Sequence, residues 1–158
     1  MTYFLMTLLA AVIVIADQVS KYLVVAQIPL GGHIEVLPGV VGLTYVQNRG
    51  AAFSMLQNQQ WLFALIFALF AVLIVWEFSK KRMPFTTLER FCIVSVFAGG
   101  FGNMIDRLRL GYVVDMIATE FINFPVFNVA DCFITCGCIL LMAHLVFFNK
   151  EFWKDEKK

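Results

Sequence analysis

Four long apolar stretches separated by polar segments form the main pattern along the chain. They cover residues 4–25, 61–78, 88–105 and 127–148, about 18–22 residues each. An α-helix rises about 1.5 Å per residue, so about 20 apolar residues cross the hydrocarbon core of a bilayer. A helix also pairs its own backbone N–H and C=O groups, which is necessary in lipid because no water is available there to bind them. The pattern predicts an all-α polytopic membrane protein, a single membrane domain over residues 1–158 with four transmembrane helices.

The connections at residues 27–60 and 106–126 have a different pattern. Residues 40–46 are mostly β-branched or aromatic and lie between Gly39 and the sequence Asn-Arg-Gly at 48–50. Residues 33–39 and 112–115 are further candidates for extended structure. Such runs, bounded by turn residues, are typical of short strands. We therefore expect a small β-rich cradle on the membrane surface.

The basic residues predict how the helices are oriented. Lys80, Lys81 and Arg82 lie in the short loop at 79–87, and further lysines follow the last apolar stretch. Cytoplasmic loops carry an excess of Lys and Arg. We therefore expect this loop and both termini in the cytoplasm, and residues 27–60 and 106–126 on the extracytoplasmic side. Because no basic residue precedes the first stretch, we expect a retained helix rather than a cleaved signal peptide.

The composition agrees with a membrane protein and excludes several other classes. Apolar residues make up 61% of the chain and charged residues 15%, against about 45–50% and 25% in soluble domains. The net charge of +1 gives no sign of a nucleic-acid partner. No nearby His or further Cys completes a metal site with the clustered cysteines. We expect buried free thiols and no cofactor at the four cysteines: Cys92, Cys132, Cys136 and Cys138.

Some polar residues lie within or beside the apolar stretches, where charge is costly. Asp17 and Lys21 are one helical turn apart, which fits either a self-neutralising ion pair or a polar wall of a cavity. Asn103 and Arg107 share one helix face, and Asp106 and Arg107 are expected to neutralise each other in part. The glycines at 99, 100 and 102 fit no phosphate-binding motif, so close helix packing is the better interpretation.

Two carboxylates form the strongest candidate site. Asn128 is a plausible N-cap, with Asp131 at the third helical position, where it can complete a capping box. Asp115 lies among apolar residues without a basic neighbour, a costly setting for an unpaired charge. Two close carboxylates share a proton, so one acts as general acid and the other as general base. The two histidines, His33 and His144, complete no serine, cysteine or metal-dependent protease motif.

These residues form motifs that resemble, in order and spacing, those of bacterial lipoprotein signal peptidase, also called signal peptidase II. The resemblance covers residues 12–145. The motifs are Asp-Gln-Val-Ser-Lys-Tyr at 17–22, Asn-Arg-Gly-Ala-Ala-Phe-Ser at 48–54, Gly-Gly-Phe-Gly-Asn-Met-Ile-Asp-Arg at 99–107, Val-Val-Asp-Met-Ile at 113–117 and Phe-Asn-Val-Ala-Asp at 127–131. Each motif is weak alone, but five in order are specific. Met116 stands where the family more often has Phe.

The resemblance implies an intramembrane aspartic endopeptidase of the bacterial cell membrane. Such an enzyme cleaves the signal peptide from diacylglyceryl-modified prolipoproteins, just before the lipidated cysteine. The family's catalytic aspartates match Asp115 and Asp131. The resemblance assigns substrate binding to six positions: Asp17, Lys21, Asn48, Asn103, Arg107 and Asn128. The implied partners are lipidated precursors and membrane lipids, and the protein is expected to be monomeric.

Two other functions fit the residues less well. A small proton- or ion-conducting transporter component would use Asp17, Lys21 and Asp131 along a path. However, the charges cluster at one membrane face, and no ladder of polar residues continues towards the other. A non-enzymatic lipid-binding subunit would use Asp131 as a helix cap and pair Asp115 with an arginine.

Overall fold

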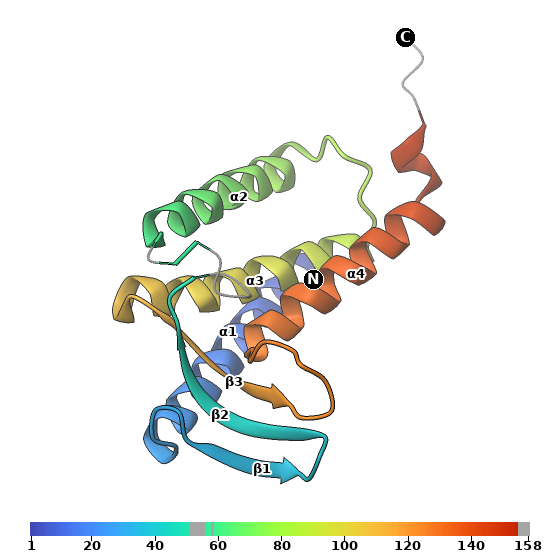
Figure 1. The fold of residues 1–158 in the computed structure, drawn as a ribbon. Helices are drawn as coiled ribbons and strands as arrows, with labels where there is room; N and C mark the ends of the chain where they lie inside the picture. The colour runs from blue at the N-terminus through green and yellow to red at the C-terminus, as the bar shows by residue number, and fades with distance from the viewer. Residues whose placement is uncertain (51–55, 58, 155–158) are drawn as a thin grey trace.

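Four long helices and one small sheet make up the structure (Figure 1), a computed structural model that describes residues 1–50, 56–57 and 59–154. The helices are α1 (Thr2–Gln27), α2 (Gln60–Lys80), α3 (Thr87–Leu110) and α4 (Val129–Phe147). The strands are β1 (His33–Leu37), β2 (Val41–Asn48) and β3 (Val113–Thr119). Each helix is long and apolar enough to cross a membrane. The predicted fold, four membrane helices with a β-rich cradle, is confirmed.

Helix α3 is the central helix, and three of its glycines each face a different neighbour. A Cβ atom on Gly99 would lie 2.6 Å from the carbonyl oxygen of Ala130 in α4. On Gly102 it would lie 2.5 Å from Oδ2 of Asp17 in α1, and on Gly100 it would lie 3.2 Å from the Phe67 ring in α2. The predicted role of these glycines in close helix packing is confirmed.

The antiparallel sheet has the order β1-β2-β3 and packs on the end of α1. Val24 and Ile28 at this end of α1 form a buried cluster with Tyr45, Val114 and Met116 of the sheet. Since side chains alternate between the faces of a strand, Val114 and Met116 direct Asp115 away from this cluster. In the register of β2 and β3, Asp115 lies opposite Val46.

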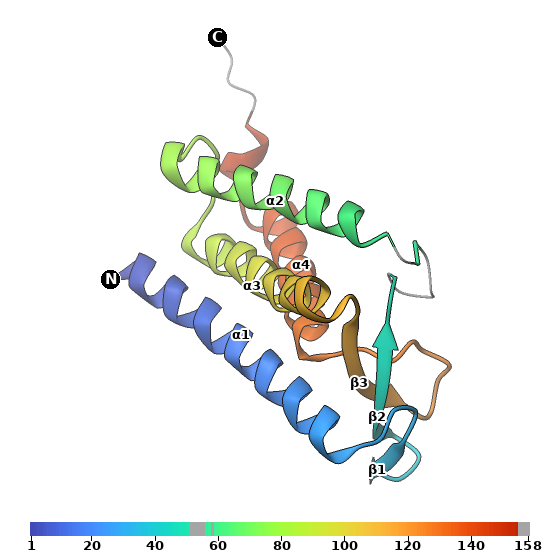
Figure 2. The same ribbon diagram turned by 90° about the vertical axis from the view of Figure 1, so that its left-hand side faces the viewer.

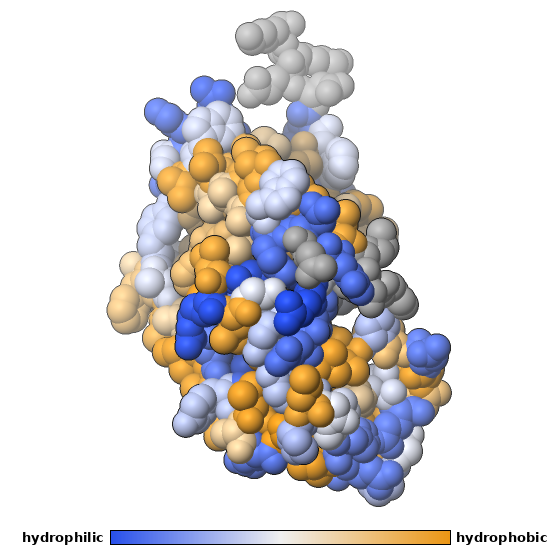
Figure 3. Space-filling model, turned by 60° about the vertical axis from the view of Figure 1, so that its left-hand side comes forward, coloured by the Kyte–Doolittle hydropathy of each residue, from blue (hydrophilic) through white to orange (hydrophobic). Residues whose placement is uncertain are grey.

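Large apolar side chains are exposed on all four helices. The face in Figure 3 is mixed, with hydrophobic side chains over much of it and hydrophilic ones gathered across its middle, at its top and at its lower right. Glu77 is the one fully buried residue of α2, all of which is described. The N-terminus, the short helix at Lys150–Trp153 and the connection between α2 and α3 lie at the end of the bundle away from the sheet (Figure 2). At that end the buried carboxylate of Glu89 accepts hydrogen bonds from His144 and Asn149.

Two details differ from the sequence-based expectations. Helix α3 continues five residues past the predicted end at 105, until Gly111 terminates it with a φ of 77°. The cysteines are free, but only Cys92 is fully buried, while Cys136 and Cys138 are exposed. The expectation of buried thiols was wrong for these two, because apolar residues on a membrane helix also cover its lipid-facing surface.

Candidate active site

An open cavity of about 860 Å³ lies where the ends of β2, α3 and α4 meet β3. Both predicted catalytic carboxylates, Asp115 and Asp131, line it. Asn48, Asn103 and Arg107 also line it. The apolar part of the lining includes Phe63, Phe124, Pro125, Phe127 and Ile134. The cavity is therefore lined by both polar and apolar side chains.

Asp131 is held by the start of α4. Asn128 is the N-cap, and its Oδ1 accepts a hydrogen bond from the Asp131 backbone N–H at 3.0 Å. The Asp131 Oδ2 atom accepts in return from the Asn128 backbone N–H at 3.2 Å. This is the predicted capping box. The other oxygen of Asp131, Oδ1, accepts from the Asn103 side-chain amide at 2.8 Å.

Asp115 is held by β3 and is 2% exposed. Its two oxygens accept hydrogen bonds from two amides, Asn48 Nδ2 at 2.9 Å and Asn128 Nδ2 at 2.6 Å. The pKa of Asp115 is raised to about 6, mainly because the side chain is buried and also because the Asp131 charge is near; the two hydrogen bonds and the Lys21 charge lower it and offset part of this rise. A carboxyl with such a pKa can hold or release its proton near neutral pH.

Asn128 connects the two carboxylates, because its backbone bonds Asp131 and its side chain bonds Asp115. Its amide also donates to Asn103 Oδ1 at 3.1 Å. Since Asn128 is 0% exposed, its amide group has fixed partners and a fixed orientation. The residue that caps α4 therefore also sets how the two candidate catalytic groups face each other.

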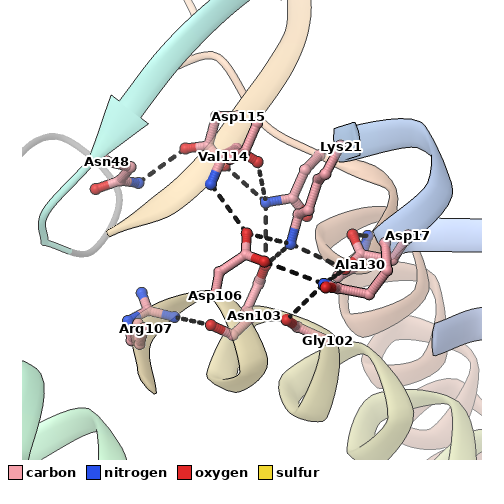
Figure 4. A network of polar contacts seen from close by, with 12 residues as sticks. Asp17, Lys21, Asn48, Gly102, Asn103, Asp106, Arg107, Val114, Asp115 and Ala130 are labelled. Atoms are coloured by element: carbon pink, nitrogen blue, oxygen red, sulfur yellow. Dashed lines mark hydrogen bonds and ion pairs between the residues drawn. The ribbon is translucent and has the colours of Figure 1, made fainter. Parts of the chain in front are cut away.

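A buried charge network lies behind the cavity (Figure 4). The Lys21 ammonium lies 2.9 Å from Asp17 and 3.1 Å from Asp106, and donates to Asn103 Oδ1 at 2.8 Å. Asp17 Oδ1 accepts from the backbone N–H of Ala130, at the start of α4. The predicted Asp17–Lys21 ion pair is present. Both side chains are buried behind the cavity rather than among the residues that line it.

Arg107 lies over the cavity from α3. Its guanidinium donates to the carbonyl oxygens of Gly50 at 3.1 Å and Asn103 at 3.4 Å, and lies 4.4 Å from the Phe63 ring centroid. Asp106 forms its ion pair with Lys21 rather than with Arg107, so the partial neutralisation expected between Asp106 and Arg107 involves no direct ion pair among the described residues. Consecutive helical residues point about 100° apart, so neighbours in sequence rarely face each other.

Sequence reasoning missed Gln18 and Asp106 as members of this network. Gln18 Nε2 lies 3.1 Å from Asp17 Oδ2, from Asp106 Oδ1 and from the Gly102 carbonyl oxygen. Their positions in the sequence could have indicated this, because Gln18 follows Asp17 and Asp106 precedes Arg107. Of the motif at 48–54, residues 51–54 lie outside the described part of the chain.

The arrangement of the site fits acid–base chemistry. Two carboxylates, each bonded by amides, face a cavity that water and an apolar substrate can both occupy. Within residues 1–50, 56–57 and 59–154, no group of three or more His, Cys, Asp or Glu side chains could hold a metal ion.

Comparison with protein families gives one match that spans most of the chain. The family model for signal peptidase (SPase) II matches residues 9–147. The lipoprotein signal peptidase of Streptococcus agalactiae serotype III (strain NEM316) is 44% identical over 149 residues, which are 94% of this chain and 92% of that protein. The lipoprotein signal peptidase of Streptococcus pyogenes serotype M1 is 42% identical over 144 residues, 91% of this chain and 90% of that protein.

Solved structures show the same fold. A bacterial membrane enzyme determined by the in meso method at 2.3 Å resolution superposes with a TM-score of 0.86 and 34% identity, covering 97% of this chain and 93% of that chain. A second, at 1.9 Å resolution, superposes with a TM-score of 0.81 and 34% identity, over 90% and 93% of the two chains.

Proposed function

Since the chain belongs to the signal peptidase II family and is therefore a multi-pass bacterial membrane peptidase, we propose that it removes signal peptides from prolipoproteins. The substrates in this proposal carry a diacylglyceryl group, and the scissile bond lies just before the lipidated cysteine. The observation that carries the proposal is the pair of amide-bonded carboxylates, Asp115 and Asp131, in a cavity lined by both polar and apolar side chains.

In the proposed mechanism the peptidase is of the aspartic type. Asp115 and Asp131 share one proton, because two close carboxylates ionise together only at a cost. The ionised carboxylate takes a proton from a water molecule as it attacks the scissile carbonyl, and the protonated one donates to the carbonyl oxygen. General acid–base assistance of this kind contributes about 10²–10⁴-fold in rate. Because the two carboxyl groups titrate together, this proton is assigned to the pair and not to one of the two residues.

The other residues of the site orient the substrate and the pair. Asn48, Asn103 and Arg107 line the cavity, so we assign substrate contact to them. Asp17, Lys21 and Asn128 are buried, with exposures of 0%, 3% and 0%, and we assign them to the support of the carboxylates. The resemblance implied that these three residues bind the substrate; we propose instead that they hold the carboxylates in place.

We place the site near the extracytoplasmic face of the cell membrane. Lys80, Lys81 and Arg82 lie at the end of the bundle away from the sheet, and the positive-inside rule puts this end in the cytoplasm. A lipid-anchored substrate remains in the bilayer, since each buried CH₂ of its acyl chains contributes about 0.8 kcal/mol. Carboxylates at the outer boundary of the bundle reach both this substrate and water.

The experiment that tests the function measures cleavage of a lipidated precursor by Asp115→Asn and Asp131→Asn in detergent or vesicles. Each variant is expected to lose at least about 10²-fold in rate, because each removes one proton-transfer group. Glu35→Gln, an exposed carboxylate of the same cradle, is the matched control and should cleave normally. Wild-type cleavage by either folded aspartate variant would exclude the proposed pair.

Neither alternative function has support. The relatives that cover most of the chain are peptidases rather than transporters or lipid-binding subunits. In addition, Asp115 bonds Asn48 and Asn128, and no ion pair joins it to an arginine in the part of the chain that the structure describes.

A further inference from the structure

Asp106 is a buried carboxylate beside the site that the proposed mechanism does not use. It lies on α3, is 3% exposed and is absent from the residues that line the cavity. Its two oxygens face three donors: Lys21 Nζ and the Val114 backbone N–H at Oδ2, and Gln18 Nε2 at Oδ1. A carboxylate with three donors, one of them cationic, is held firmly in one position.

One of these contacts leads to Asp115. The Val114 backbone N–H donates to Asp106 Oδ2 at 3.0 Å, and this bond joins α3 directly to β3 one residue before Asp115 (Figure 4). Val114 is itself 2% exposed, so the bond lies in a region without competing water. Asp106 therefore fixes the backbone that carries Asp115.

A second contact leads to Asp131. Asp106 and Asp17 hold the Lys21 ammonium from two sides, and this ammonium donates to Asn103 Oδ1 at 2.8 Å. With its oxygen engaged in this way, the Asn103 amide must turn its Nδ2 towards Asp131, 2.8 Å away. Asp106 therefore fixes, through Lys21, the donor that orients Asp131.

We infer that Asp106 is a positioning residue that sets the relative geometry of Asp115 and Asp131, reaching the first through the Val114 N–H and the second through Lys21 and Asn103. The inference rests on the proposed catalytic role of the two aspartates. Asp106 also adds a negative charge that offsets Lys21, and Lys21 lowers the pKa of Asp115. Its charge should therefore affect the pH at which the pair works.

The test is the Asp106→Asn variant, assayed for kcat, KM and pH dependence on a lipidated precursor. We expect kcat to fall by about 10²-fold, as for a misplacement of catalytic groups by about 1 Å, with KM within about twofold of wild type because Asp106 does not line the cavity. The Lys21 charge is then less neutralised and lowers the pKa of Asp115 further. The pH optimum should move towards acid by about half a unit, less than a directly contacting charge produces.

Glu89→Gln is the matched control. Glu89 lies on the same helix, is 0% exposed and accepts several hydrogen bonds, but it is about 25 Å from Asp106 along the helix axis. A general loss of packing would affect both variants alike in thermal unfolding. Only Asp106→Asn should change the pH optimum, because only Asp106 is close to the pair.

A second variant tests the positioning role of Asp106 without leaving the Lys21 charge less neutralised. Gln18→Met removes the neutral donor to Asp106 Oδ1 and should lower kcat by about 10-fold with KM unchanged. Asp106→Asn should also lower kcat much less when Asn103 is already replaced by alanine, because Asp106 and Asn103 act in one chain of contacts. A wild-type kcat for Gln18→Met, or an unchanged pH optimum for Asp106→Asn, would overturn the inference. It would do so even where Asp115→Asn and Asp131→Asn are inactive and the proposed function stands.

Discussion

Asp115 is deeply buried, and the proposed mechanism requires its carboxyl group to change its protonation state. Its side chain is bonded by the amides of Asn48 and Asn128, yet burial still raises its pKa to about 6. Hydrogen bonds to the charged form offset only part of the desolvation of a carboxylate. The buried carboxylate of Asp115 therefore has an energetic cost that lowers the stability of the folded state, which is typical of functional residues.

This cost predicts how stability depends on pH. The folded protein holds the Asp115 proton up to about pH 6, whereas an ordinary aspartate releases it near 3.8. The stabilisation by this proton is full below about pH 4 and is lost as the pH rises through 6, at most about 3 kcal/mol. The free energy of unfolding in detergent, measured from pH 4 to 7, should thus fall more steeply for the wild type than for Asp115→Asn. Parallel curves would contradict the prediction, and Glu35→Gln should follow the wild type.

At the scale of single residues, the sequence predicted the two carboxylates that line the cavity but not all of the residues that hold them in place. Asp115 and Asp131 were recognisable because they are carboxylates in apolar surroundings without a local basic partner. The partner of Asp106 was not recognisable, because Lys21 lies 85 positions earlier in the chain and Arg107 is adjacent. Only the packing of α1 against α3 decides between these two cations.

Among the elements, the start of α4 serves both folding and the site. Asn128 caps the helix through its side-chain oxygen and contacts Asp115 through its side-chain nitrogen. The sequence left open whether Asp131 is a capping residue or a catalytic one. The capping box is present, and it is also the contact that holds Asp131 at the cavity.

The two roles of Asn128 predict separable effects. Asn128→Ser keeps an oxygen for the Asp131 backbone N–H but loses the amide donors, whereas Asn128→Ala loses both. The alanine variant should be less stable than the serine variant by about 1 kcal/mol, the usual contribution of an N-cap. Both should lose at least about 10-fold in cleavage, because neither can donate to Asp115. Normal cleavage by Asn128→Ser in the same preparations would show that the cap alone matters.

The contact of α3 with α4 gives another prediction at this scale. Gly99→Ala places a methyl group against the Ala130 carbonyl, part of the α4 backbone, so the two helices must separate. Gly100→Ala meets only the ring of Phe67 at 3.2 Å, which can move. We expect Gly99→Ala to lower the midpoint of thermal unfolding and the cleavage rate. Gly100→Ala should leave both near wild type or raise the midpoint, since alanine favours a helix by about 0.5–1 kcal/mol. Equal effects would argue against a specific contact at Gly99.

For the whole molecule, the apolar pattern was sufficient to predict four helices and a surface sheet. The periodicity could not give the tilt and contacts of the helices, because lipid-facing and protein-facing apolar residues look alike in sequence. The exposed Cys136 and Cys138 illustrate this limit, and the contacts of the three α3 glycines with three different helices illustrate what only packing reveals.

The proposed orientation of the whole molecule is directly testable. In a variant whose native cysteines are replaced by serine, single cysteines at Lys80 and at Glu35 mark the two ends of the bundle. A membrane-impermeant thiol reagent added to intact cells should label Glu35→Cys and leave Lys80→Cys unlabelled until the cells are opened. The reverse pattern would place the cavity on the cytoplasmic side. A Lys80→Cys variant that cleaves its precursor normally shows that the substitution has not disturbed the fold.

Helix α2 has a further consequence for how the enzyme relates to its surroundings. The ring of Phe67 in α2 stacks on Phe97 and Phe101 of α3, and Phe63 of α2 lines the cavity. Most of the remaining surface of α2 is exposed. Its 21 residues span about 31 Å, close to the hydrocarbon thickness of an average bilayer, and helices tilt when that thickness changes. A bilayer of different thickness that tilts α2 would therefore move Phe63 and, with it, part of the lining of the cavity.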